Sequence, residues 1–336
     1  MTTSARAGDS GGFAVRDWLL VAAAALMWGS SFLLIKLGVH GCFAPGTVAW
    51  LRLLFGAAAL ALVPAARKPL RHHRDRGRVA LLGLTWMAVP FVLFPLAEQS
   101  IPSALAGMIN GAAPLFTAAF AAVWSRRRPA GSVLAGLAVG FAGVLAVSLP
   151  AVGGGASLTG IGLVLLATML YGVAFNLAEP LENRNGALPV IWRAQLAALA
   201  LDTPAGVAGL VHSTPHLSGL VAMAGLGVLS TGAAFAAFTT LIARVGATRA
   251  SVTIYLVPVV AIGLGASVSG EPIAPLSLAG IALVLLGAYL TGRRANRPLE
   301  NPPAPGSARL DRPPVLLPAS QQLTARMRPC DTNHPG

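Results

Sequence analysis

Four charged side chains stand within long apolar runs of this sequence, and a fifth candidate lies just beyond one. Lys36, Arg52, Arg193 and Asp202 lie inside such runs, and Glu271 follows one. A charge in an apolar segment is costly to bury, so it usually pairs, binds a ligand or carries charge. We therefore predict gating or charge-bearing roles for all five. The open alternatives are interfacial anchoring by snorkelling for Lys36, anchoring or tethering of carbonyls for the two arginines, and capping of a helix end for Asp202.

A second group of side chains has the chemistry to contact a bound solute. Pro114 frees the backbone carbonyl of Asn110 from its helical hydrogen bond. Pro258 frees the backbone carbonyl of Ile254, the residue before Tyr255, in the same way. Mirrored helix breaks of this kind at mid-depth point to a binding site, while a kink that serves packing stays the alternative. The predicted substrate-binding residues are Trp28, Ser31, Asn110, Pro114, Tyr171, Asn176, Tyr255 and Pro258.

Catalytic and metal chemistry are not predicted. The only cysteines are Cys42 and Cys330, and neither has a neighbour at metal-ligand spacing. His72 and His73 lie in a basic loop without an acidic or cysteine partner. We expect no metal, no cofactor and no enzymatic activity. A membrane-embedded enzyme is the alternative from a different class of protein.

The composition indicates that the candidate residues are carried by helices that lie in a lipid bilayer. Hydrophobic residues make up 55% of the 336 residues, charged residues 10%, and the mean hydropathy is +0.71. A soluble domain carries about 25% charged residues, so this chain has too few to cover its surface in water. Ten apolar runs approach the length of about 20 residues that spans a bilayer. They are approximately 18–39, 47–66, 79–97, 103–124, 131–149, 159–177, 188–210, 217–242, 250–269 and 276–292.

The basic residues predict how these spans are oriented. With a cytoplasmic N-terminus, 21 of the 24 lysines and arginines fall in cytoplasmic segments, and the other three are inside spans. Both termini are then cytoplasmic. The basic loop 67–78 would face the anionic inner leaflet of the plasma membrane, so nucleic acid is not a predicted partner.

Internal similarity divides the spans into two sets of five. An offset of 144 places Pro114 over Pro258 and the LAG of 134–136 over that of 278–280. Because five is odd, the second set must cross the membrane in the opposite sense. We predict an all-α integral membrane protein with a 5+5 inverted-topology repeat. Its parts are a cytoplasmic segment 1–17, repeats 18–149 and 159–292, and a disordered Pro-rich cytoplasmic tail 293–336.

The motifs in these spans resemble a known family, the EamA-type transporters of the drug/metabolite transporter superfamily. They are Trp28-Gly29-Ser30-Ser31-Phe32, Trp50-Leu51-Arg52, LAGLAVGFAGVLAV (134–147), TIYLVPVVAIGLGASVSGEP (253–272) and LAGIALVLLGAYL (278–290). The resemblance implies ten helices around a central cavity that moves small metabolites, often outward. The family usually has a Glu after spans 4 and 9. Glu271 matches the second, but Arg127 occupies the first position.

The predicted function is secondary transport, with export of a small organic metabolite such as an amino acid or a drug-like compound by alternating access. An anion or phosphate-metabolite exchanger that uses Lys36 and Arg52 is the alternative within the same fold. GxxxG spacings at Gly107/Gly111 and Gly136/Gly140 suit packing within one subunit or between two, so a homodimer stays open.

Overall fold

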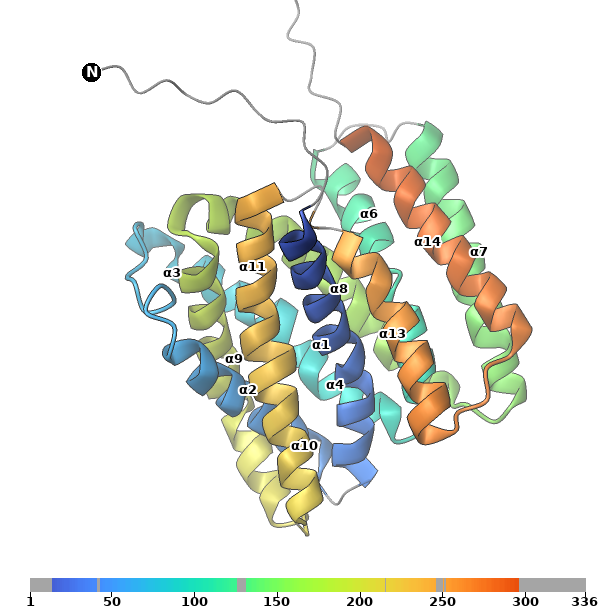
Figure 1. The fold of residues 1–336 in the computed structure, drawn as a ribbon, viewed down its shortest axis with the longest axis horizontal. Coiled ribbons are helices and arrows are strands. Elements are labelled where there is room, and N and C mark those ends of the chain that lie inside the picture. Colours follow the sequence, from blue (N-terminus) through green and yellow to red (C-terminus); the bar gives the residue numbers. More distant parts are fainter. Residues whose placement is uncertain are drawn as a thin grey trace, which may run out of the picture. The chain divides into compact units, whose positions relative to one another are not determined.

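The computed structural model describes residues 14–40, 43–125, 131–214, 216–245, 250 and 252–295. All regular secondary structure in these ranges is helical, and no strand occurs there (Figure 1). This confirms the expected all-α fold. The predicted N-terminal segment 1–17, apart from its last four residues, and the predicted tail beyond 295 lie outside the described residues.

The helices of the first half run from α1 to α7. Their bounds are α1 Val15–His40, α2 Pro45–Ala61, the 3-10 turn η1 His73–Asp75, α3 Arg76–Gly83, the π-helix η2 Leu84–Ala88, α4 Val89–Glu98, α5 Ser103–Asn110, α6 Ala113–Ser125 and α7 Gly131–Gly153. Those of the second half are α8 Leu158–Asn185, α9 Ala187–Leu210, α10 Leu217–Gly227, the π-helix η3 Val228–Ala233, α11 Ala234–Val245, α13 Val252–Ser269 and α14 Pro275–Ala295.

Length and composition mark the fold as that of a membrane protein. Six helical segments of the described chain are long and apolar enough to cross a bilayer. They are Val15–His40, His73–Glu98, Ser103–Trp124, Val133–Gly153, Leu158–Asn185 and Leu217–Ile242. Shorter apolar helices cover Pro45–Ala61, Thr253–Ser269 and Pro275–Leu290. Large apolar side chains such as Leu62 and Val211 are more than four-fifths exposed, as expected where the surface faces lipid.

Two π-helices occupy corresponding positions in the halves. Leu84, which begins η2, and Val228, which begins η3, are 144 positions apart, the offset that aligns the prolines. Each π-helix joins two α-helices into one continuous segment. A π-turn adds one residue to a helical turn and commonly occurs at functional sites. The duplication therefore survives in local backbone geometry as well as in residue types.

Helices α7 and α14 pack through glycines, backbone against backbone (Figure 1). A methyl group on Gly143 would lie 2.6 Å from the carbonyl oxygen of Gly280, and one on Gly287 would lie 2.5 Å from that of Gly136. Only glycine permits such an approach. Gly107 instead packs against side chains, those of Ala261 and Phe32. The GxxxG spacings are thus used inside one subunit.

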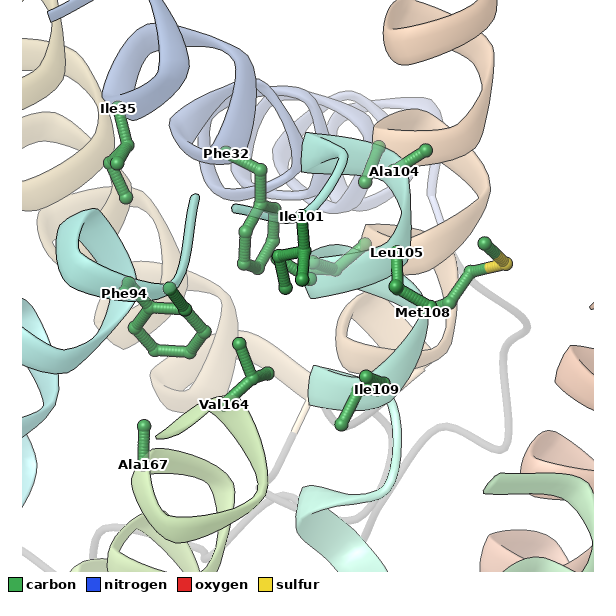
Figure 2. Packing of buried hydrophobic residues seen from close by; sticks show 14 of the residues in the cluster. Phe32, Ile35, Phe94, Ile101, Ala104, Leu105, Met108, Ile109, Val164 and Ala167 are labelled. Atoms are coloured by element: carbon green, nitrogen blue, oxygen red, sulfur yellow. The ribbon is translucent and has the colours of Figure 1, made fainter. Parts of the chain in front are cut away.

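A buried apolar core joins helices that are far apart in the sequence. Figure 2 shows Phe32 of α1, Phe94 of α4, Ile101 of the α4–α5 connection and Val164 of α8 gathered together. Burial of such side chains stabilises a packed interior by roughly 1.5–3 kcal/mol each in water. In lipid, close packing supplies much of the attraction between helices. The core holds α8, the first helix of the second half, firmly against the first half.

The two prolines do not break their helices alike. Gly111 and Ala112 form a turn that separates α5 from α6, close to Pro114. In contrast, α13 continues through Pro258, so the predicted mirrored break is wrong for the second half. The difference follows from the preceding residues, because a glycine weakens a helix by about 1 kcal/mol relative to alanine. The stretch before Pro258 contains no glycine.

Helix α9 also differs from expectation. It continues past Asp202 and through Pro204 to Leu210, so Asp202 does not cap a helix end as the alternative reading had it. A proline in a helix interior removes one hydrogen bond but need not end the helix. Asp202 is therefore a buried residue within a continuous helix.

Candidate functional site

A chain of aromatic rings runs between the halves, and we call it the aromatic band. Its members are Trp28, Phe32, Trp86, Phe94, Tyr171, Phe175, Phe235 and Phe238. They come from α1, η2 and α4 of the first half and from α8 and α11 of the second. Both halves therefore contribute to one apolar, polarisable surface.

The rings of the band contact one another in sequence. The Phe94 ring lies 5.6 Å from Phe32 and 5.9 Å from Tyr171, and Tyr171 stacks on Phe175 at 6.1 Å. Trp86 then meets Phe175 at 5.4 Å, edge to face.

The same edge-to-face packing continues to the other end of the band. Phe235 lies 5.3 Å from Trp86 and 5.7 Å from Trp28, and Trp28 meets Phe238 at 4.9 Å. Such arrangements suit the charge distribution of aromatic rings, and their faces attract apolar groups and cations.

Arg52 lies beside this band and is 7% exposed. Its Nε donates a 3.0 Å hydrogen bond to Thr231 Oγ1 in η3, and its guanidinium carbon is 3.7 Å from the centroid of the Phe91 ring. It also interacts electrostatically with Tyr171 and Glu98. No carboxylate lies within 4 Å of Arg52 in the part of the chain that the structure describes. Its charge is thus held by a hydroxyl and an aromatic face.

Arg193, its counterpart in the repeat, makes different contacts. One Nη1 donates to the carbonyl oxygens of Pro189 at 3.1 Å and Ala66 at 3.4 Å, which is the carbonyl-tethering alternative. The partner of Arg52, Thr231, corresponds to Met87 at the offset of 144. Methionine cannot accept a comparable hydrogen bond, so the two arginines are equivalent in sequence but not in environment.

Lys36 and Glu271 both satisfy backbone groups at helix ends. Lys36 Nζ donates to the carbonyl oxygens of Glu98 at 3.0 Å and Ile101 at 2.9 Å, so it does not simply snorkel to an interface. The Glu271 carboxylate accepts from Ser103 N and Oγ at 2.9 and 2.8 Å and from Ala104 N at 2.8 Å. It therefore caps the N-terminus of α5 and joins the second half to the first.

Glu98 is a site residue that was missed in the sequence, because it lies one position beyond the predicted span 79–97. It ends α4, is 0% exposed, and neither of its carboxylate oxygens has a hydrogen-bond partner within the described ranges. It interacts electrostatically with Lys36, Arg52 and Glu271. Its spacing in the sequence could have indicated this role. Glu98 follows Phe94 by four positions and Phe91 by seven, which places all three on one helix face.

The remaining predicted binding residues are dispersed. Trp28 and Tyr171 belong to the aromatic band, whereas Ser31 Oγ is bound to the carbonyl oxygen of Trp28, 2.6 Å away within its own helix. Asn176 Nδ2 donates to the carbonyl oxygens of Thr117 at 3.0 Å and Gly172 at 2.8 Å, which links α6 to α8.

The other predicted residues lie around the α5–α6 break or in α9. Asn110 Oδ1 is buried without a partner among the described residues, as is Asp202 Oδ2. Pro258 packs toward Gly111, and Tyr255 lies half-buried against the core. Pro114 is the second residue of α6.

Ion pairs join the halves at the end of the molecule where α1 begins and α11 ends (Figure 1). Arg244 Nε is 2.5 Å from Asp17 Oδ1. Asp75, a buried residue, receives Arg184 Nη2 at 3.2 Å and Asn185 Nδ2 at 2.8 Å. Each contact crosses from a first-half to a second-half residue, so this end is closed by polar links between the halves.

A groove opens at the opposite end. Its volume is about 570 Å³, and its lining includes Lys36, Gln99, Ser100, Pro272 and Ser277. These residues come from α1, the α4–α5 connection, the α13–α14 connection and the start of α14. No group of three or more His, Cys, Asp or Glu side chains that could hold a metal occurs within the described ranges.

Comparison with known proteins decides the family. The model of the EamA-like transporter family matches residues 17–149 and again 158–293. The chain belongs to this family. The resemblance read from the sequence motifs is thereby confirmed. Because the members are membrane transporters, family and helix composition together identify a multi-pass membrane protein with a transport function.

Relatives from three organisms extend over most of this EamA-like protein. A probable terminal-alkyne amino-acid exporter of Streptantibioticus cattleyicolor is 31% identical over 82% of this chain and 93% of its own. An uncharacterised transporter of Archaeoglobus fulgidus is 27% identical over 83% and 100%. A probable amino-acid metabolite efflux pump of Escherichia coli is 28% identical over 82% and 94%.

One crystal structure supports the fold. It aligns with a TM-score of 0.58 at 20% identity and covers 84% of this chain and 99% of the other. At this identity the similarity speaks for the fold alone.

Proposed function

We propose that this EamA-like protein is a secondary transporter of the plasma membrane that exports a small organic metabolite by alternating access. The observation that carries the proposal is the aromatic band. It is built by both halves and lies among helices that end in a groove on one side and in ion pairs between the halves on the other. A surface shared by two halves can be presented to either side when the halves move.

Ten spans with both ends in the cytoplasm form the proposed topology. In its support, the described helices group into ten successive segments that overlap the apolar runs of the sequence. These segments are 15–40, 45–61, 73–98, 103–125, 131–153, 158–185, 187–210, 217–245, 252–269 and 275–295. A reporter fused after residue 294 should be cytoplasmic, and one inserted at 154–155 should be external. The reverse result would refute the orientation.

The surface of the basic loop 67–78 supports the same orientation. Its lysine and arginines are exposed, whereas Asp75 turns inward to Arg184 and Asn185. The positive charges are thus free to contact the anionic inner leaflet, at roughly 1 kcal/mol each.

A neutral or zwitterionic substrate fits the site better than a multiply charged anion. Lys36 is engaged by two carbonyl oxygens, and Arg52 by Thr231 and Phe91. Neither cation is free without rearrangement, which disfavours the phosphate-exchanger alternative. The aromatic band offers apolar and cation-attracting faces. Because two relatives are named for amino-acid compounds, we propose amino acids and their derivatives as the first substrates to test.

Metabolite profiling of the culture medium tests the proposal. Cells that overexpress the protein should enrich a small solute outside, relative to empty vector and to an Arg52→Ala variant inserted at the same level. Equal enrichment in cells with the protein, with the empty vector and with the Arg52→Ala variant would show that the solute leaves by another route. An unchanged medium, followed by no flux in proteoliposomes loaded with an amino-acid mixture, would refute export of this class.

A further inference from the structure

Two carboxylates lie near the groove, and they differ in how their oxygens are satisfied. Glu271 accepts three hydrogen bonds, two of them from backbone N–H groups at the start of α5. Glu98 also feels the positive charge of Lys36, whose Nζ binds its backbone carbonyl oxygen, yet its side-chain oxygens receive no donor in the described chain. One carboxylate is a fixed structural anion, and the other is left unused.

The surroundings of Glu98 allow only a very small ligand. The residue is 0% exposed, so in this conformation it cannot contact a solute of several atoms. An ionised carboxylate that is buried without donors carries a large desolvation penalty, which the uptake of a proton removes. We propose that Glu98 is a proton-binding site that couples solute export to proton entry. This inference rests on the proposed transport function.

The groove supplies a route for the proton. Gln99, the next residue, and Lys36, which holds the Glu98 carbonyl oxygen at 3.0 Å, both line it. In the proposed topology the groove is external, so protons reach Glu98 from outside. The step forms one O–H bond on a carboxylate oxygen and changes the charge of the residue from −1 to 0. Movement of the halves then exposes the carboxyl group to the cytoplasm, where the proton is released.

The groups that face Glu98 set the electrostatic balance of this step. They are Lys36 from α1, Arg52 from α2 and Glu271 from the connection before α14. From α8, Tyr171 interacts with Arg52. The adjoining α5 and η2 contain no ionisable residue. With Glu98 ionised, the two cations and two carboxylates cancel. Protonation leaves one excess positive charge, which favours return of the proton.

Infrared titration of the purified protein tests the proton site without any solute. We expect a protonated-carboxyl band that changes with pH, disappears in Glu98→Gln and shifts in frequency in Glu98→Asp. The band should persist in Asp202→Asn, which removes a second buried carboxylate that has an unpartnered oxygen among the described residues. A band that is unchanged in both Glu98 variants, or that disappears in Asp202→Asn instead, would overturn the proposal.

Proteoliposomes with an imposed pH difference test the coupling. The probe is the radiolabelled solute that medium profiling identifies. For one proton exchanged per neutral solute, a difference of one pH unit supports up to about tenfold accumulation. Glu98→Gln should lose accumulation and Glu98→Asp, which keeps a carboxyl group, should retain part of it, whereas accumulation that persists in Glu98→Gln would refute coupling. If the unmodified protein moves no solute, the transport function fails, and the infrared titration still decides whether Glu98 binds a proton.

Discussion

Replacing Asp17 with asparagine should open the end of the protein where α1 meets α11. The Asp17 side chain is 7% exposed and that of its partner, Arg244, is 36% exposed. Exposed ion pairs contribute about 0.2–1 kcal/mol, and hydrogen bonds to charged groups about 1.5–3 kcal/mol. A pair with one buried and one partly exposed partner extends from the top of the first range to the lower part of the second, at about 1–2 kcal/mol. If the pair forms only while this end is closed, its loss raises the open population about 5- to 30-fold.

A buried cysteine can report this opening. Ala24 is 0% exposed and lies seven residues deeper along α1 than Asp17, about 10 Å by helical rise. The assay uses Ala24→Cys in a chain whose Cys42 and Cys330 are replaced by serine. In inside-out vesicles, the labelling rate with an impermeant maleimide should rise about 5- to 30-fold in Asp17→Asn.

Arg78→Gln is the matched control for this assay. Arg78 is 3.9 Å from Asp75 and its side chain is 64% exposed, so its loss should leave the labelling rate nearly unchanged. An unchanged rate in Asp17→Asn, or an equal rise in both variants, would refute the reasoning. Charge exchange by Asp17→Arg together with Arg244→Asp should restore slow labelling, which a general loosening of the fold would not allow.

Three further substitutions test separate contacts. Gly143→Leu should abolish the α7–α14 contact and lower the yield of folded protein in gel filtration, whereas Gly153→Leu, at a position where an added Cβ has no atom within 4 Å, should not. Thr231→Val removes the acceptor of the Arg52 Nε hydrogen bond and should cost about 1.5–3 kcal/mol of stability. A thermal-unfolding midpoint equal to that of the parent would contradict this. Glu271→Gln weakens the cap of α5 and should cost about 0.5–2 kcal/mol in the same measurement, with no loss if the three hydrogen bonds are unimportant.

The helices and the repeat were predictable because they rest on local patterns. Apolar runs report lipid burial directly, so the helical segments follow them closely. The offset of 144 that aligns Pro114 with Pro258 also relates the two π-helices, although nothing in the sequence signalled a π-turn. The α5–α6 break depends on Gly111 beside Pro114, a combination that the second half lacks.

The site was less predictable because long-range contacts decide it. Glu98 ends an apolar run, where a carboxylate can face water or the interior, and only the packing of distant helices makes it buried. Lys36, which binds its carbonyl oxygen, is 62 residues away. Arg52 and Arg193 look equivalent in the repeat. However, Thr231 accepts a hydrogen bond from Arg52, whereas Met87, the counterpart of Thr231, cannot accept a comparable one from Arg193. The aromatic band likewise joins rings from both halves.

The glycine contact between α7 and α14 has a consequence for biosynthesis. Gly143 packs against Gly280 and Val284, and Gly287 packs against Gly136. The ribosome adds residue 287 after residue 143 with a delay of 144 residues. At 5–20 residues per second this delay is about 7–30 s. During that interval α7 is inserted without its main partner, and lipid covers its glycine face. A nascent chain that lacks α14 therefore cannot form this contact, and the glycine face of α7 becomes buried in protein only after α14 has been made.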